Sequence, residues 1–333
     1  MRAILSPLGW IYGSVSTLRR RLYDANKFET VRLSKPVISV GNLTVGGTGK
    51  TPLVDFLLTS FEEKGIESCV LTRGYGRKSQ KSLVVEKCHV VDDVGDEPLW
   101  LFHRHPKTKI LVSQIRALAA REIDNVEVFI LDDGFQHYQL KRDFEIVLLD
   151  ATRPLWHYEI LPRGYGRENF SALGRADLII LTKSNIVPEN IINNLKDRIS
   201  KVTDSQVILS HLLFDRAEDF GGKNINIEGK KIYCLSGIGN PQSFENVIID
   251  GRGIVAGHRV FPDHAHYTKA RIKSAIEEFK NSRADFLLMT EKDAVKWRSN
   301  NFMTSDNFGY VVARLKFSPQ LPSIYDLALN NFN

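Results

Sequence analysis

The sequence predicts an α/β protein with a doubly wound, mostly parallel sheet, a second, smaller α/β domain, and an N-terminal amphipathic helix. Short, continuously apolar runs such as residues 146–149 are typical of strands that are covered on both faces. Helical stretches separate several of these runs, and this alternation is typical of a parallel sheet with helices on both sides. Hydrophobic residues make up 43% of the 333 residues and charged residues 25%, which excludes a disordered or fibrous chain.

Residues 1–30 are expected to contain an amphipathic helix. Its apolar residues recur at spacings of four and three, which places one set on a single face: Ile4, Leu8, Ile11, Val15, Leu18 and Leu22. A basic cluster, Arg19 to Arg21, follows these residues, whereas a signal peptide carries its charge in front, so cleavage is not expected. Packing on the protein's own domain and contact with a membrane surface both fit this pattern.

Residues 31–220 are expected to form the larger α/β domain. Its strands are predicted at 37–40, 68–72, 109–113, 126–131, 144–150 and 177–182. Residues 215–230 are polar and contain glycine, and a second alternation follows them. It consists of strands at 231–235, 253–256 and 285–289 and a helix at 269–280. We therefore expect a domain boundary near residue 220 and a smaller C-terminal domain over 221–333 that contributes to the active cleft.

The strongest chemical signal is a glycine-rich loop between the first strand and the first helix of the larger domain. It reads Thr44-Val45-Gly46-Gly47-Thr48-Gly49-Lys50-Thr51. The backbone N–H groups of such a loop bind polyphosphate, with the lysine on the β- and γ-phosphates and the hydroxyl of Thr51 on Mg²⁺. The usual pattern begins with glycine where this chain has Thr44, but the strand–loop–helix context still predicts a P-loop NTPase-like fold.

Two carboxylates, Asp132 and Asp133, follow the strand at 126–131. Ligands bind at the carboxyl ends of strands in such sheets, so one of these aspartates is expected to hold Mg²⁺ directly or through water. Strand-end aspartates are also common as caps, and the nearby loop favours the metal role over that one. Together the two motifs predict binding of a nucleoside triphosphate, and they leave the phosphate acceptor open.

Charge and cysteine content narrow the possible partners only slightly. A formal net charge of +6 favours anionic partners, which include nucleic acid, nucleotides, phosphorylated substrates and acidic lipid surfaces. Three scattered cysteines indicate a reducing compartment rather than a disulfide framework.

Two further groups of polar residues have ordinary structural explanations. Asp96 and Glu97 precede Pro98 and fit a helix start. No third ligand stands near His264 and His266 at a spacing typical of metal-binding motifs, so a metal site there is not favoured.

The ordered set of motifs resembles the tetraacyldisaccharide 4′-kinases, the lipid A 4′-kinases of Gram-negative bacteria. The matching segments are 44–51, 71–77, 95–98, 132–137, 161–168, 236–241, 261–264 and 290–296. Their order along most of the chain, rather than any single motif, carries the resemblance. Segment 161–168, which contains Arg167, departs from the form that is usual in the family.

The resemblance implies ATP-dependent phosphorylation of the 4′-hydroxyl of a tetraacylated glucosamine disaccharide 1-phosphate, with Mg²⁺. It implies peripheral attachment at the cytoplasmic face of the inner membrane, with the lipid substrate and the membrane surface as partners. Neither nucleic acid nor an obligate protein partner is expected. The residues carried over are Asp96 as the catalytic base, His264 as its partner, Lys50, Arg116 and Arg167 in the active site, and Thr51, Asp132, Asp133 and Glu97 toward the metal.

Three other functions compete with this interpretation. A P-loop GTPase or ATPase that acts as a switch or metal chaperone is suggested by residues 181–185, which resemble the guanine-reading [NT]KxD motif, but Asn185 stands where that motif has aspartate. A non-enzymatic membrane protein with a vestigial phosphate loop conflicts with the intact Lys50 and Thr51. A kinase for a soluble sugar is the third alternative, and only the N-terminal helix argues against it on physical grounds.

Overall fold

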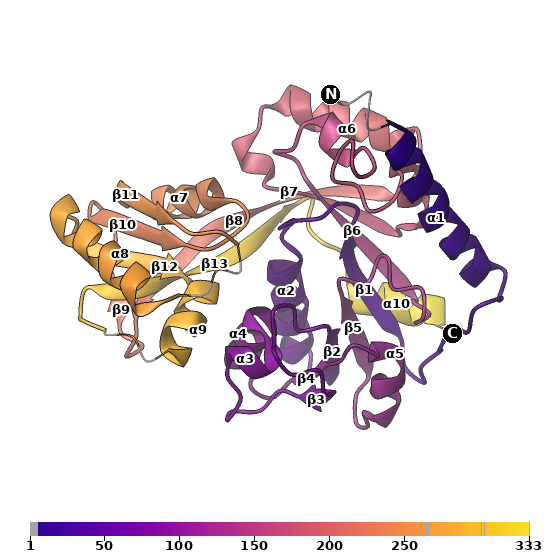
Figure 1. The fold of residues 1–333 in the computed structure, drawn as a ribbon, viewed down its shortest axis with the longest axis horizontal. Coiled ribbons are helices and arrows are strands. Elements are labelled where there is room, and N and C mark those ends of the chain that lie inside the picture. Colours follow the sequence, from indigo (N-terminus) through magenta and orange to yellow (C-terminus); the bar gives the residue numbers. More distant parts are fainter. Residues whose placement is uncertain (1–5, 264, 266, 301, 303, 333) are drawn as a thin grey trace.

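The computed structural model describes residues 6–263, 265, 267–300, 302 and 304–332, and this part of the chain forms one 13-stranded sheet with helices on both faces (Figure 1). The strands are β1 (Val37–Asn42), β2 (Ser68–Thr72), β3 (Leu83–Val84), β4 (Lys109–Val112), β5 (Val128–Asp132), β6 (Phe144–Asp150), β7 (Leu178–Thr182), β8 (Gln206–Asp219), β9 (Asn224–Ile225), β10 (Lys231–Ser236), β11 (Ile254–Val260), β12 (Phe286–Thr290) and β13 (Phe308–Ser318). The α-helices are α1 (Ser6–Asp24), α2 (Lys50–Glu63), α3 (Val91–Val94), α4 (Asp96–Arg104), α5 (Arg116–Ala119), α6 (Glu189–Ser200), α7 (Pro241–Asp250), α8 (Lys269–Ser282), α9 (Glu291–Ser299) and α10 (Ile324–Phe332).

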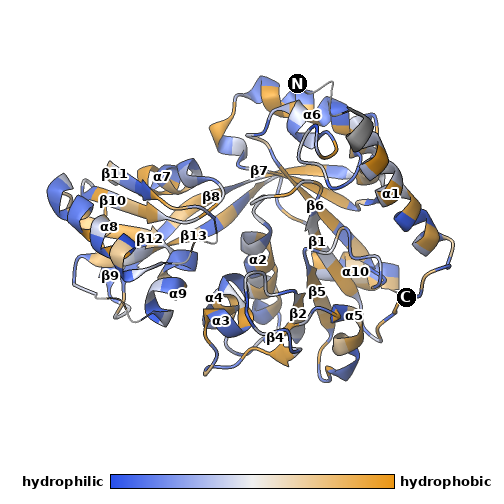
Figure 2. Cartoon of the chain, viewed as in Figure 1, coloured by the Kyte–Doolittle hydropathy of each residue, from blue (hydrophilic) through white to orange (hydrophobic). Residues whose placement is uncertain are grey.

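The first lobe confirms the predicted doubly wound sheet. Its strand order is β3-β4-β2-β5-β1-β6-β7-β8, and every neighbouring pair is parallel except β3 with β4. One face packs against α2, α4 and α10, and the other against α5 and α6. All seven residues of β6 are buried, which is the reason that this strand reads as one apolar run. The hydropathy colours in Figure 2 show the same apolar strands beneath helices with hydrophilic outer surfaces.

The second lobe continues the same sheet through an antiparallel pair of long strands. β8 pairs with β13, and the remaining order is β13-β12-β10-β11, all parallel. Figure 1 shows β8 and β13 running from one lobe into the other. Residues 215–219, which the sequence suggested as part of a polar boundary, are the end of β8. Asp215 and Arg216 are exposed and only Ala217 is buried, so this end of the strand lacks the continuous apolar run on which the strand predictions depended.

The last helix returns to the first lobe. In α10, Ile324 and Ala328 are buried within the apolar core that also contains strands β1 and β6. Asn331 donates a hydrogen bond to the carbonyl oxygen of Asp143 at 2.8 Å. The predicted boundary near residue 220 is therefore a division along the sequence only. In space, β8, β13 and α10 connect the two lobes.

Helix α1 packs through its small residues and exposes its large apolar ones. A Cβ atom at Gly13 would lie 3.0 Å from Ile160 Cδ1, so the glycine allows the helix to lie close to the 160s segment. The side chains of Ile11, Val15 and Leu18, from the predicted apolar stripe, are 62%, 61% and 58% exposed. These three residues of the stripe are therefore directed outward rather than into the core. In the described residues no helix is both long and apolar enough to cross a membrane.

A partly buried polar cluster links α2 with the end of α4. His105 lies between two carboxylates, with Nε2 2.9 Å from Asp55 Oδ1 and Nδ1 2.9 Å from Glu62 Oε2. An ionised carboxylate only accepts hydrogen bonds, so both ring nitrogens donate and the ring is an imidazolium. Burial by itself lowers the pKa of His105, but the hydrogen bonds to Asp55 and Glu62 raise it above the ordinary value.

We expect His105→Asn to lower the free energy of unfolding by about 1–3 kcal/mol at acidic pH, because it removes a charged donor from two carboxylates. Because the pKa of His105 is raised in the folded state, its charge stabilises the folded protein fully at pH values below the unfolded pKa of about 6.5. This contribution to stability is lost as the pH rises through the folded pKa. Urea unfolding of the wild type and the variant from about pH 5 to about pH 9 should therefore give a difference that shrinks as pH rises. A difference that stays constant over this range would contradict the charged state.

Candidate functional site

The glycine-rich loop leads from β1 into α2 with its backbone held open. Gly46 and Gly49 have φ values of +104° and +88°, in the region that favours glycine. Thr182 Oγ1 donates to the carbonyl oxygen of Thr48 at 3.0 Å, and Lys183 Nζ donates to that of Gly47 at 3.2 Å. Side chains at the end of β7 therefore donate to carbonyl oxygens of the loop. The loop keeps its N–H groups at the N-terminus of α2 for an anion.

The other end of the loop is tied to the 160s segment. The backbone N–H of Val45 donates to the carbonyl oxygen of Tyr165 at 2.9 Å, and Thr44 forms an antiparallel bridge with Gly166. The side chain of Thr44 is buried at the position where the usual motif has glycine. The departure from the motif is therefore accommodated by a short strand-like pairing.

At the carboxyl end of the sheet, Asp133 forms ion pairs with Lys50 and Arg167, two of the basic residues predicted for the site. It accepts hydrogen bonds from both terminal nitrogens of Arg167, at 3.0 and 2.9 Å. Lys50 Nζ lies 3.4 Å from Asp133 Oδ1. Burial alone would raise the pKa of Asp133, but Lys50 and Arg167 together hold it well below its usual range. Asp133 is therefore an ionised carboxylate that contacts the phosphate-loop lysine.

Asp132 is the buried member of the acidic pair. Thr72 Oγ1 donates to its Oδ2 at 2.9 Å, while the buried Oδ1 has no hydrogen-bond partner among the described residues. Burial and the negative charge of Glu97 raise the pKa of Asp132, against the charge of Lys50. A buried carboxylate oxygen without a donor beside further carboxylates is a suitable ligand for a cation.

Arg116 lies behind this pair rather than in the open site. Its side chain is buried, and Nη1 donates to the backbone carbonyl oxygen of Asp132 at 2.5 Å. Burial lowers its pKa to about 10, so the guanidinium stays charged at neutral pH. Arg116 therefore fixes the end of β5, where Asp132 and Asp133 lie.

Asp96 and Glu97, at the start of α4, face two lysines of α9 in the second lobe. Lys296 Nζ lies 3.3 Å from Asp96 Oδ2, and Lys292 Nζ donates to Glu97 Oε1 at 3.2 Å. Lys292 also lies 3.7 Å from Asp96 Oδ2. Burial would lower the pKa of Lys292, but the charges of Glu97 and Asp96 raise it, so its ammonium is charged. The predicted base therefore lies at the interface of the two lobes.

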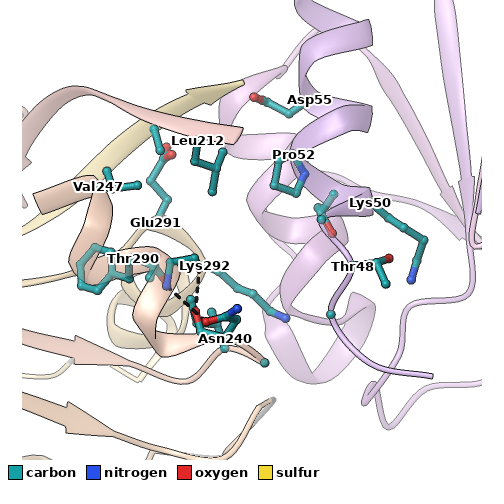
Figure 3. Close-up of a pocket in the computed structure, with 18 of the residues that line it drawn as sticks. Thr48, Lys50, Pro52, Asp55, Leu212, Asn240, Val247, Thr290, Glu291 and Lys292 are labelled. Atoms are coloured by element: carbon teal, nitrogen blue, oxygen red, sulfur yellow. Dashed lines mark hydrogen bonds between the residues drawn. The ribbon is translucent and has the colours of Figure 1, made fainter. Parts of the chain in front are cut away.

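A cavity of about 230 Å³ lies between the lobes (Figure 3). Its polar end is formed by residues 47–51 together with Glu97, Asp263 and Lys292. Its apolar lining comes from α2, α4, α7 and the long strands β8 and β13: Pro52, Trp100, Leu212, Phe244, Val247, Val311, Ala313 and Leu315. An apolar slot that ends in a phosphate loop has the chemistry expected of a nucleotide site.

The residues predicted to hold Mg²⁺ fit that ion. Mg²⁺ takes oxygen ligands, and it commonly uses one or two carboxylates together with substrate phosphates rather than a complete protein cage. The donorless Oδ1 of Asp132 and the hydroxyl of Thr51, at the first turn of α2, are oxygens of this kind. Within the described residues no three His, Cys, Asp or Glu side chains form a preassembled metal site. A site completed by phosphate oxygens is consistent with that geometry.

The structure brings most of the predicted site residues together and adds two. Lys50, Thr51 and Glu97 line one cavity, and Asp132, Asp133 and Arg167 cluster at the adjoining strand ends. His264 lies outside the described residues. The two added residues are Lys292 and Lys296, to which the sequence alone assigned no role. Their spacing of four residues within 290–296 was the available signal, because it places both on one helix face.

Comparison with known proteins finds relatives that match most of the chain. The sequence model of the family Tetraacyldisaccharide-1-P 4′-kinase matches residues 1–330. A tetraacyldisaccharide 4′-kinase from Bdellovibrio bacteriovorus is 36% identical over 307 residues, covering 90% of each chain. One from Syntrophotalea carbinolica is 37% identical over 306 residues, covering 88% of this chain and 83% of its own.

Among solved structures, the fold is similar to the "apo" form of LpxK from Aquifex aeolicus, crystallised in complex with ATP. The TM-score is 0.78 at 28% sequence identity, over 100% of this chain and 99% of that one. The match in sequence and fold covers both lobes, including the phosphate loop and the two-lysine helix α9. The chain belongs to the tetraacyldisaccharide-1-P 4′-kinase family.

Proposed function

We propose that this protein transfers the γ-phosphate of ATP to the 4′-hydroxyl of a tetraacylated glucosamine disaccharide 1-phosphate, a late step of lipid A biosynthesis. The observation that carries the proposal is the placement of Glu97 in the cavity that the phosphate loop lines, with Asp96 next to it in the chain. Glu97 lines that cavity, whereas Asp96 lines a second cavity of about 280 Å³. Adjacent carboxylates thus border two spaces, one suited to the phosphate donor and one to the acceptor.

The chemistry requires a proton acceptor and positive charge. A sugar hydroxyl is too weakly acidic to ionise at neutral pH, so a carboxylate positioned to accept its proton assists the transfer. We assign this role to Asp96, which Lys292 and Lys296 hold within 3.7 and 3.3 Å of their ammonium groups. The resemblance adds His264 as its partner. Lys50 would contact the β- and γ-phosphates from the loop, and its ion pair with Asp133 keeps it at the cavity.

Mg²⁺ would be held by Thr51 and by carboxylates from the set Asp132, Asp133 and Glu97. When bound, the ion would supply positive charge that stabilises the negative charge developing on the phosphates during transfer. The protein's own contribution is the fixed position of these oxygens: Arg116 anchors the end of β5, and Arg167 holds the carboxylate of Asp133.

A lipid acceptor requires the enzyme to reach a membrane surface, and we assign that contact to α1 at the cytoplasmic face of the inner membrane. Trp10 is 79% exposed beside the exposed stripe of Ile11, Val15 and Leu18. The arginines at 19–21 follow on the same helix, where they can approach anionic headgroups. An in-plane helix with apolar residues toward lipid and arginines near phosphate is consistent with peripheral binding.

We expect the triple variant Ile11→Ser, Val15→Ser, Leu18→Ser to lower partitioning to anionic liposomes at least about a hundredfold, because each buried apolar side chain contributes about 1.5–3 kcal/mol. ATP affinity should stay unchanged, since the stripe does not line the nucleotide cavity. A matched control replaces Ile249 and Ile254 in the second lobe, which are 56% and 52% exposed, with serine. Equal flotation of wild type and triple variant would contradict the assignment.

The activity is tested by ADP release with a series of acceptors. We expect Mg²⁺- and ATP-dependent ADP release with the acylated disaccharide 1-phosphate in detergent micelles, and little with the deacylated disaccharide. Equal activity with the deacylated acceptor would favour a soluble-sugar kinase. A strong preference for GTP over ATP would favour the GTPase switch.

The segment 181–185, which resembles the guanine-reading motif, has another role in the structure. Its Lys183 contacts Asp150 and the carbonyl oxygen of Gly47 in the phosphate loop.

A further inference from the structure

Lys292 is a cation that the second lobe places in the nucleotide cavity. It is the second residue of α9 and lines the cavity together with residues 47–51 of the first lobe. Figure 3 shows its side chain extending from the second lobe toward the loop that carries Thr48. The side chain is only 17% exposed, so its charge is directed into the space between the lobes rather than into solvent.

Three carboxylates lie around the ammonium of Lys292. Its Nζ lies 3.2 Å from Glu97 Oε1, 3.5 Å from Asp263 Oδ1 and 3.7 Å from Asp96 Oδ2. On the other side of the cavity, Lys50 contacts Asp133 in the same way. Each lobe thus supplies one lysine, and each lysine lies against carboxylates that the proposed function assigns to the metal or to the acceptor proton.

Lys292 lies close to the phosphate loop itself. A Cβ atom at Gly47 would lie 3.9 Å from Asp263 Oδ2 and 3.7 Å from the Cα of Gly239. Asp263 therefore borders both Gly47 and the ammonium of Lys292. Lysine is a compact charge on a flexible four-carbon stem, so its ammonium can move between a carboxylate and a phosphate group bound at the adjacent loop.

We propose that Lys292 binds the γ-phosphate of ATP from the second lobe, so that the transferred group is held between Lys50 and Lys292. The inference rests on the proposed function, because the γ-phosphate is the group transferred. During transfer, negative charge spreads over the three equatorial oxygens, and a cation from a separate element stabilises it there. Lys292 supplies that charge only when both lobes enclose the nucleotide, which ties catalysis to the assembled cleft.

Lys296, one turn further along α9, has a different environment. Its Nζ contacts Asp96 and Asp293 and lies 5.5 Å from the centre of the Tyr267 ring. It lines the second cavity with Asp96 rather than the nucleotide cavity. We assign Lys296 the role of positioning the carboxylate of Asp96. Its replacement should therefore lower kcat and leave the ratio of the ATP and ADP affinities unchanged.

The test compares the affinities of the intact protein for ATP and ADP with Mg²⁺, measured by calorimetry. We expect Lys292→Met to weaken ATP binding about tenfold, equivalent to about 1.4 kcal/mol, and to leave ADP binding within about twofold. The rate of transfer to the lipid should fall about a hundred- to a thousandfold. Lys292→Arg keeps the charge and should restore most of the preference for ATP. Lys296→Met should keep the wild-type ratio of the two affinities.

The matched control is Arg298→Met. Arg298 lies on the same helix but stacks over Phe220 and Tyr310, 5.5 and 5.1 Å from the ring centres, and does not line the cavity. Its nucleotide affinities should equal those of the wild type. Equal weakening of ATP and ADP in Lys292→Met would show a structural role and overturn the proposal, as would unchanged ATP affinity and rate. A wild type that binds ATP but transfers nothing to the lipid would instead overturn the proposed function.

Discussion

Lys50→Ala is expected to lower kcat/KM by about a hundred- to a thousandfold, because a buried cationic contact that strengthens in the transition state contributes about 3–4 kcal/mol. The side chain leaves the first turn of α2 and is held at the cavity by Asp133, 3.4 Å away. Its removal leaves that carboxylate facing the phosphates with less positive charge nearby. Steady-state kinetics with ATP and the acylated acceptor measure the loss.

Lys64 provides the control for this experiment. It caps the other end of α2, where it donates from the surface to Ser323. Lys64→Ala should keep the wild-type rate, so a loss confined to Lys50→Ala reflects the phosphate site rather than the helix. A fall of less than about tenfold, or about 1.4 kcal/mol, would show that the loop does not bind the transferred phosphate.

Asp96→Asn is expected to lower kcat about a hundred- to ten-thousandfold while the affinity for ATP stays nearly unchanged, because the amide cannot accept the hydroxyl proton. Asparagine keeps the shape of the side chain and loses only the charge that faces Lys296 and Lys292. Stopped assays at saturating ATP and acceptor measure kcat, and calorimetry measures ATP binding.

Two further variants separate the roles at this position. Glu97→Gln, the neighbour assigned to the metal, should raise the Mg²⁺ concentration needed for half-maximal activity, whereas Asp96→Asn should not. If Asp96 and His264 act as one unit, the double variant Asp96→Asn, His264→Ala should lose little more activity than the worse single variant. Fully additive losses would indicate independent roles. Near-normal activity of Asp96→Asn would remove the assigned base.

The first lobe was largely predictable from sequence because its strands are covered on both faces. The expected strands at 68–72 and 144–150 coincide with β2 and β6, whose residues are all buried. The same rule fails for β8 and β13. In β8 the buried Ala217 stands among charged residues, and Arg216 forms ion pairs with both Asp215 and Glu218. A strand of that composition resembles a linker until its partner is known.

The site was predictable where its chemistry lies within one motif. The phosphate loop and the Asp132–Asp133 pair each follow a strand, so their neighbourhood follows from the order of the parallel sheet. The contact of Lys292 with Glu97 joins residues 195 positions apart and depends on the packing of α9 against α4. Neither periodicity nor composition predicts that packing, because it depends on the orientation of the second lobe about β8 and β13.

The central claim is tested most directly by following a labelled γ-phosphate into the lipid. Tetraacylated glucosamine disaccharide 1-phosphate in detergent micelles is incubated with [γ-³²P]ATP, Mg²⁺ and the wild-type protein, and Lys50→Ala serves as the negative control. The proposed function predicts one new labelled lipid that carries two phosphates, with the added phosphate on the 4′-oxygen in ³¹P–¹H correlation spectra. Label that appears only as inorganic phosphate, or that is attached to another oxygen of the disaccharide, would contradict it.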